Sequence, residues 1–277
     1  MTSTEAARAI LASIPGWTTR PANLTVLHGG LNHRTFRVES DGERYVLRIA
    51  SQERVTGGGN RALEYSLQQQ AAARGLAATV LFADASRGLV LMEYLQGDVL
   101  TPRQLASRST LQQIGELLCE LHAQPLCGVN FDPLAAAETY LDKLEPGRSS
   151  AAFARQCIEI VSNTPPPRER RCCHNDVVAS NLIQGRSLQL LDFEYACDNE
   201  PMFDLASLIG WHNLAANESK LLLEAYAGEF TQELGARLSA QCRLFDALQW
   251  LWLAVRQCQQ PENWKETQMA KVRKRLI

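Results

Sequence analysis

Short apolar stretches that alternate with polar residues, or run without interruption, fill the first third of the chain. They predict strands over 24–27, 35–38 and 45–49. Residues 40–43, Ser-Asp-Gly-Glu, are typical of a tight turn between the second and third stretch. Consecutive strands joined by tight turns favour pairing between neighbours, so these stretches predict an antiparallel meander.

Two further strands and two helices complete the prediction for this part of the chain. Residues 4–13 and 60–74 have helical composition and periodicity, whereas 80–82 and 88–94 are apolar runs of strand length. We therefore predict a five-stranded antiparallel sheet with one helix over residues 20–95.

After Gly97 the hydrophobic period becomes helical, as in residues 110–123, where apolar residues recur every three or four positions. The same spacing predicts helices over 134–143, 150–161, 204–215, 218–228 and 232–258. Residues 170–195 differ, because short apolar runs surround polar clusters there, and they predict a small β insert. The pattern thus predicts an α+β protein with an N-terminal lobe over 1–95 and a larger, mostly helical lobe over 96–277.

Composition narrows the class of protein. The chain has 277 residues, 28 Lys+Arg and 30 Asp+Glu, for a formal net charge of −2. Hydrophobic residues make up 45% of the chain and charged residues 21%, which is ordinary for a globular protein and excludes a disordered chain or a coiled coil. The near-zero net charge argues against a nucleic-acid partner. The basic segment 271–275 is interpreted as a solvated helix end, where cations are favourable.

Neither the apolar runs nor the cysteines indicate a membrane or an oxidising environment. No apolar run reaches the length of a membrane span, and residues 1–5 lack the pattern of a secretory signal. None of the eight cysteines has Cys-x-x-Cys spacing, and the adjacent Cys172 and Cys173 lie in an apolar run, which favours buried thiols over a redox pair. We therefore expect a cytoplasmic protein with no membrane partner.

The strongest chemical signal is a set of polar side chains between two apolar runs. His174, Asp176 and Asn181 follow one run, and Asp192 ends the next. Phosphoryl transfer needs a carboxylate to orient and deprotonate the attacking hydroxyl, and an amide oxygen and a second carboxylate to hold magnesium on the nucleotide. A polar turn with capping residues is the alternative, but four such residues at this spacing favour a phosphoryl-transfer site.

Here the sequence resembles a known family. His-Asn-Asp-x4-Asn at 174–181, Asp-Phe-Glu-Tyr at 192–195 and Phe-Asp-Leu-Ala at 203–206 resemble the choline/ethanolamine kinase branch of the aminoglycoside-phosphotransferase and protein-kinase-like superfamily. The resemblance implies a two-lobed protein-kinase-like fold with ATP in the cleft between the lobes. It also implies that Asp176 is the catalytic base and that His174 braces its loop. Asn181 and Asp192 would be the Mg²⁺ ligands.

The resemblance also assigns nucleotide contacts in the N-terminal lobe. Gly29, Gly30 and Asn32 occupy the place of a phosphate-covering loop, although two adjacent glycines taken alone favour a plain hairpin turn. The segment that contains Glu93 and Leu95 corresponds to the hinge, whose backbone would bind adenine.

Arg48 ends the third predicted strand, where most kinases have lysine and choline-kinase-like sequences commonly have arginine. A guanidinium can bind phosphate with two hydrogen bonds and still pair with a carboxylate. Glu64, on the following helix, is the expected partner, with a solvated helix face as the alternative for that residue.

The acceptor site is expected in the helical lobe. Choline kinases hold a quaternary ammonium against aromatic rings, and Tyr195, Trp211 and Trp252 are the candidates here, with Asp176 and Glu194 as carboxylates near the cation. Trp250 lies two positions from Trp252 and therefore points to another face of a helix, so at most one of the two is expected to line the pocket and the other to lie in the core. Trp252 is chosen here for the pocket.

We therefore predict an ATP- and Mg²⁺-dependent phosphotransferase acting on a small cationic alcohol, with choline or ethanolamine ahead of thiamine. Two positions depart from eukaryotic choline kinases: Val178 replaces a glutamine, and residues 209–211 lack a glutamate. Residues 192–198 fit the Asp-aromatic-Glu-Tyr-Ala-x-Asp pattern of thiamine kinases. An aminoglycoside phosphotransferase is a weaker alternative because residues 110–277 are not markedly acidic, and an inactive pseudokinase module is an alternative of another class.

Overall fold

The computed structural model of the chain describes residues 3–27, 33–50, 60–144 and 151–277. Contacts between Cα atoms divide the chain into two units. The sheet unit comprises Met1–Val99 and Leu182–Tyr195, and the helical unit comprises Leu100–Asn181 and Ala196–Ile277. The division expected at residue 95 remains a prediction about domains, and the contacts differ from it chiefly in assigning Leu182–Tyr195 to the N-terminal part.

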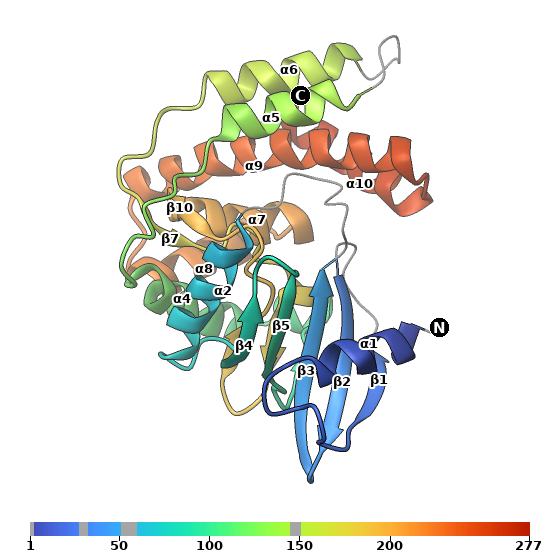
Figure 1. Cartoon of the computed structure of the whole chain (residues 1–277). Coiled ribbons are helices and arrows are strands. Elements are labelled where there is room, and N and C mark those ends of the chain that lie inside the picture. Colours follow the sequence, from blue (N-terminus) through green and yellow to red (C-terminus); the bar gives the residue numbers. More distant parts are fainter. Residues whose placement is uncertain (1–2, 28–32, 51–59, 145–150) are drawn as a thin grey trace. The chain divides into compact units, whose positions relative to one another are not determined.

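The sheet unit is built on five antiparallel strands. They are β1 (Asn23–Leu27), β2 (His33–Ser40), β3 (Glu43–Ala50), β4 (Val80–Asp84) and β5 (Leu89–Glu93). Their order in the sheet is β1-β2-β3-β5-β4, as can be followed in Figure 1. The predicted five-stranded antiparallel sheet is confirmed.

Both faces of this sheet are covered. Leu89 and Leu91 of β5 join the core formed with α1 (Ser3–Ala12), whereas Val90 and Met92 join the core next to α2 (Arg61–Ala72). The division follows from the strand itself, because successive side chains point to opposite faces.

The same alternation places Arg48. Its neighbours Leu47 and Ile49 in β3 are buried in the core on the α1 side. Arg48 therefore projects from the opposite face, where α2 presents Glu64.

A small three-stranded sheet completes the sheet unit. Its strands are β6 (Asp98–Val99), β8 (Leu182–Gln184) and β9 (Leu188–Leu190), in the order β6-β8-β9. The Leu190 N–H donates to the Leu76 carbonyl at 2.8 Å, which ties the β8–β9 hairpin to the segment after α2. Asp192 follows β9 by two residues, so this hairpin sets its position.

The helical unit contains the long helix α9 (Gln232–Gln259) and the helices packed on it. The other elements are α3 (Pro102–Leu105), α4 (Arg108–His122), α5 (Pro133–Asp142), α6 (Ala151–Ser162), β7 (Arg171–Cys173), a 3-10 helix (Ala179–Asn181), β10 (Cys197–Asn199), α7 (Met202–His212), α8 (Ala216–Ala227) and α10 (Asn263–Leu276). Contacts join α9 to α5, α6, α7, α8 and α10. Side-chain caps start several helices: Thr101 for α3, Ser107 for α4, Asp132 for α5 and Thr231 for α9.

Helix α10 bears out the interpretation of the basic tail as a solvated helix end for the exposed Lys271, Arg273 and Lys274, but not for Arg275. Arg275 forms an ion pair with the buried Asp246 of α9 and donates to the Gly210 carbonyl at 3.0 Å. Val272 and Leu276 are buried on the same helix. The tail therefore packs on α9, because its apolar residues and Arg275 recur at helical spacing among the exposed lysines.

The expectation of buried thiols at Cys172 and Cys173 is confirmed, and all eight cysteines are free. Burial raises the pKa of the Cys172 thiol to about 12, which keeps it protonated and unreactive near neutral pH. Among the helices that the structure describes, none combines the length and the apolar character needed to cross a bilayer.

Candidate active site

The segment predicted to carry catalysis is a tight connection between β7 and the 3-10 helix. Asn175 has a left-handed backbone with φ of 63°, which asparagine tolerates better than most residues. Asp176 follows, and its Oδ2 accepts a hydrogen bond of 2.8 Å from Nδ2 of Asn181. The same amide nitrogen donates to the Asp176 carbonyl at 3.0 Å. The predicted base and one predicted metal ligand therefore lie next to each other.

His174 supports this connection from inside. It is fully buried, and its Nδ1 lies 3.3 Å from the Asp176 backbone nitrogen, which donates to it. The ring thus contacts the backbone that carries the Asp176 carboxylate, and the bracing role that the family resemblance implies for His174 stays a prediction.

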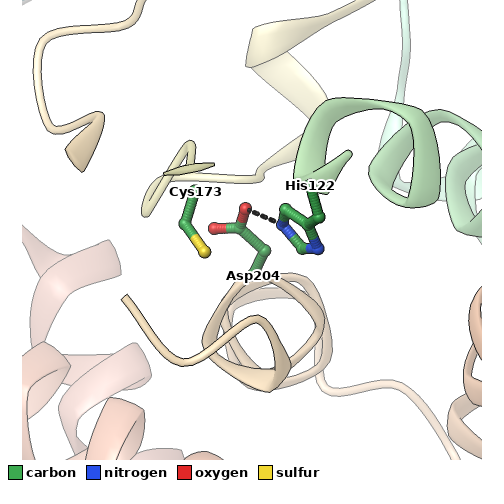
Figure 2. A group of neighbouring side chains, drawn as sticks. All are labelled: His122, Cys173 and Asp204. Carbon is green, nitrogen blue, oxygen red and sulfur yellow. Dashed lines mark hydrogen bonds and ion pairs between the residues drawn. The ribbon is translucent and has the colours of Figure 1, made fainter. Parts of the chain in front are cut away.

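Asp204 of α7 anchors the same segment through its backbone. Its Oδ1 accepts the Asn175 N–H at 2.6 Å and its Oδ2 accepts the His174 N–H at 2.8 Å. His122, at the end of α4, places Nε2 2.9 Å from Oδ2 and Nδ1 3.0 Å from the Tyr226 hydroxyl. Figure 2 shows the Asp204 carboxylate between His122 and the neighbouring Cys173. Charge-assisted bonds of this kind are roughly twice as strong as neutral ones.

His122, Cys173 and Asp204 place their ligand atoms within 4.8 Å of one another, yet their chemistry does not favour a metal centre (Figure 2). Burial raises the pKa of the Cys173 thiol well above its ordinary value, whereas metals bind the thiolate. Both Asp204 oxygens already accept backbone N–H groups. The cluster therefore acts as an anchor for the loop.

Two more side chains of α7 hold the loop. Ser207 Oγ accepts the Val177 N–H at 3.1 Å, and His212 Nε2 accepts the Ala179 N–H at 2.9 Å. Burial lowers the pKa of His212 to about 4, so the ring is neutral at physiological pH and can accept this bond.

Sequence reasoning noted Asp204 only as part of a family motif and missed Ser207, His212 and His122. Asp204, Ser207 and His212 share one face of a largely apolar helix, and this polar stripe was a usable signal. His122 gives no such signal, because it simply ends an amphipathic helix.

In the sheet unit, Arg48 lies between two carboxylates. One guanidinium nitrogen pairs with Glu64 of α2, and the other donates to Asp192 Oδ1 at 2.7 Å. The expected Arg48–Glu64 pair is present, and the contact with Asp192 was not anticipated. Asp192 has φ of 61°, which turns the chain sharply after β9.

Glu194 and His33 extend this cluster. Both side chains are buried, and His33 Nε2 lies 3.3 Å from Glu194 Oε2. Glu194 was expected to act on the acceptor, whereas the sequence did not single out His33. Taken separately, Asp192 and Asn181 each carry a hard oxygen donor of the kind that Mg²⁺ prefers, as expected of the residues that the family resemblance assigns to this metal.

The remaining residues expected to contact the nucleotide lie only partly within the described part of the chain. Gly29, Gly30 and Asn32 lie outside the described residues. Glu93 ends β5 with an exposed side chain, and its backbone N–H donates to the Thr79 carbonyl at 3.0 Å. Leu95 is partly buried against the core on the α2 side.

Among the acceptor candidates, Trp211 and Trp252 contact each other, with ring centroids 6.1 Å apart. Trp250 is buried against Phe153, as expected for a core residue. Tyr195 belongs to the sheet unit and is half-buried.

Comparison with known protein families identifies the family to which the chain belongs. The model of the phosphotransferase enzyme family (APH) matches residues 23–252, which include both polar clusters described above. The chain belongs to this family. Its α+β fold, with the five-stranded sheet followed by a helical region, is that of the choline-kinase-like members.

Individual relatives within the phosphotransferase family are distant. Protein LicA of Haemophilus influenzae is 29% identical over 73% of this chain and 62% of its own length. Thiamine kinase of Escherichia coli is 28% identical over 67% of this chain and 65% of its own length. The chain thus spans less than two thirds of both. The solved choline/ethanolamine kinase family protein from Mesorhizobium loti is 25% identical over 98% of this chain and 94% of its own, with a TM-score of 0.78.

Proposed function

We propose that this phosphotransferase is an ATP- and Mg²⁺-dependent kinase that phosphorylates the hydroxyl of a small cationic alcohol such as choline or ethanolamine. The observation that carries the proposal is the Asp176–Asn181 hydrogen bond, on a loop that α7 holds through Asp204, Ser207 and His212. So many anchors on one short loop are unnecessary for a simple turn. They are expected where a carboxylate must be held in a fixed position.

In the proposed reaction, Asp176 orients the acceptor hydroxyl and accepts its proton as the oxygen attacks the γ-phosphorus. General-base assistance of this kind contributes typically about 10²–10⁴-fold. Asn181 binds Asp176 through its amide nitrogen, so its oxygen is the atom that can hold magnesium. Asp192 is the second magnesium ligand that the family resemblance implies. Bound magnesium would neutralise phosphate charge.

Arg48 is the proposed phosphate contact, oriented by Glu64. Arg48→Ala is expected to raise the KM for ATP and to lower kcat, because it removes a cation that the transition state uses more than the ground state. Steady-state kinetics with ATP varied at saturating acceptor measures both.

Losing Arg48 also removes the cation that faces the buried Glu64, which destabilises the fold by about 3–5 kcal/mol. The double variant Arg48→Ala/Glu64→Gln removes that penalty and should keep the kinetic defect. Arg37→Ala on β2, whose partner Glu39 has a side chain that is 44% exposed, is the matched control and should behave as the parent. Unaltered KM and kcat in the double variant would contradict the assignment.

The paired indole rings of Trp211 and Trp252 are the reason for proposing a cationic acceptor. Aromatic rings bind soft cations with roughly 0.5–2 kcal/mol each. The Arg256 guanidinium already lies 5.8 Å from the Trp252 ring centroid, so a cationic acceptor would share that ring with a resident positive charge. The carboxylates of Asp176 and Glu194 are the proposed counter-charges.

A phosphate-transfer assay with choline, ethanolamine, thiamine and an aminoglycoside, with and without Mg²⁺, tests the proposal directly. Transfer to choline or ethanolamine ahead of thiamine is expected. Thiamine kinase is the second candidate, because residues 192–198 fit its motif and the Escherichia coli thiamine kinase is among the relatives. Transfer to neutral sugars alone would contradict the proposal of a cationic acceptor. No transfer to any acceptor would favour a binding module without catalytic activity.

Within this assay, Trp252→Ala should raise the KM for the acceptor more than the KM for ATP. Trp250→Phe is the control on the same helix, because Trp250 is buried against Phe153 and its change should lower stability alone. Equal effects of the two variants on the acceptor KM would exclude Trp252 from the acceptor site.

A further inference from the structure

His33 has a buried side chain that, within the described residues, contacts a carboxylate but accepts and donates no hydrogen bond. Its side chain is only 5% exposed, and among the described residues neither ring nitrogen makes a hydrogen bond. Its Nε2 lies 3.3 Å from Glu194 Oε2, an ion-pair contact that lacks the geometry of a hydrogen bond. Leaving a buried polar group unsatisfied costs about 1–3 kcal/mol, so such a group points to a missing ligand.

The surroundings of His33 are rich in carboxyl groups. A ring nitrogen of His33 and carboxylate oxygens of Glu64 and Asp192 all lie within 4.8 Å of one another. With Glu194 alongside, three carboxyl groups share this part of the sheet unit with one guanidinium, that of Arg48. The formal charge of the cluster is therefore negative, which favours a further cation.

We propose that His33, Glu64 and Asp192 form a site for a transition-metal dication of the Mn²⁺ type, distinct from the magnesium position assigned to Asn181 and Asp192. An imidazole donor with two carboxylates suits Mn²⁺ and its neighbours in the first transition row, whereas Mg²⁺ prefers oxygen donors and retained water. The three ligand atoms come from β2, α2 and the segment after β9, so the fold itself gathers them.

The site competes with Arg48. Arg48 binds both Glu64 and Asp192, and a dication on the same two carboxylates repels the guanidinium. Resting on the proposed function, this competition makes the metal inhibitory, because it displaces the residue assigned to the phosphates. Mn²⁺ in excess should then inhibit Mg²⁺-dependent transfer.

The binding test uses the full-length protein and Mn²⁺ without nucleotide. Electron spin echo envelope modulation detects a nitrogen bound directly to Mn²⁺, and labelling histidine alone with ¹⁵N identifies that nitrogen as imidazole. We expect a ¹⁴N modulation in the parent, its replacement by a ¹⁵N pattern after labelling, and its loss in His33→Gln. Mn²⁺ titrations followed by electron paramagnetic resonance should show binding at least about tenfold weaker in His33→Gln.

Two further variants separate this site from its neighbours. Cys173→Ser alters the other three-residue cluster and should leave the histidine modulation unchanged. Arg48→Met removes the competing cation and should strengthen Mn²⁺ binding. Absence of Mn²⁺ binding, Mn²⁺ bound without a histidine signal, or a signal that persists in His33→Gln would overturn the site.

The inhibition is tested separately. Mn²⁺ should inhibit Mg²⁺-dependent transfer by the parent and have little effect on His33→Gln. Equal inhibition of both would overturn the competition while the spectroscopic result stands. A protein that transfers no phosphate to any acceptor contradicts the proposed function, and the resonance measurements then still decide the metal site.

Discussion

Replacing Asp192 by asparagine is expected to abolish phosphate transfer while leaving the fold intact. Asparagine has the same size and tolerates the left-handed backbone that Asp192 adopts, with φ of 61°. The substitution removes the negative charge that would hold magnesium and that faces Arg48 at 2.7 Å. Removal of one preorganised electrostatic group lowers kcat by about 10²–10³-fold, and loss of a metal ligand is expected to reach at least that range.

The measurement is kcat over a magnesium titration, alongside thermal unfolding. Asp41→Asn is a matched control, because Asp41 has φ of 53° and also accepts a hydrogen bond from an arginine, Arg20. That contact lies at the exposed β2–β3 turn, so its change should leave kcat unaffected. Full turnover of Asp192→Asn at saturating magnesium would exclude Asp192 as the metal ligand.

The sheet was predictable because its information is local. Alternating apolar residues in β2 and β3 and the Asp41-Gly42 turn between them determine both strands and their pairing, and the two turn residues have positive φ in the structure. The insert around β8 and β9 was predicted as β structure, yet its place beside the segment after α2 was not. That placement depends on contacts between residues more than a hundred positions apart, such as Leu76 and Leu190.

Helix α10 was recognised only as a basic helix end. Its mean hydropathy is low, and the residues that fix it, Val272, Leu276 and Arg275, are few and spread among lysines and other polar residues. The partner that makes Arg275 structural is Asp246, buried in α9, and nothing in the sequence near either residue connects them.

The residues of the candidate site also fall into those that the sequence reveals and those that only the structure reveals. The motif residues from His174 to Asn181 were found because they are contiguous and lie between apolar runs. His122 and His33 were not found, because each is a single polar residue whose significance comes from a distant carboxylate, Asp204 in one case and Asp192 in the other. A buried histidine resembles any other position in an amphipathic helix or strand until its neighbours are known.

The second large effect is expected at Asp204. Its two oxygens accept the backbone N–H groups of His174 and Asn175, and it is fully buried. In Asp204→Asn an amide NH₂ group replaces one of the two carboxylate oxygens, so one of the two buried backbone N–H groups loses its acceptor. The other N–H still meets an oxygen, but that oxygen no longer carries a negative charge. Breaking such a buried, charged network costs an estimated ~3–5 kcal/mol.

Because these bonds hold the loop that carries Asp176, we also expect kcat of the folded Asp204→Asn protein to fall by about 10²-fold, the scale that a small displacement of a catalytic group produces. Asp198→Asn provides the matched control. Asp198 is likewise buried and accepts two backbone N–H groups, from Cys127 and Gly128 at 2.9 and 2.8 Å, but it makes these bonds outside the loop. Urea unfolding should show a loss of stability in both variants, whereas kcat, corrected for the folded fraction, should fall in Asp204→Asn alone. If the corrected kcat of the two variants is the same, Asp204 stabilises the helical unit without positioning the catalytic loop.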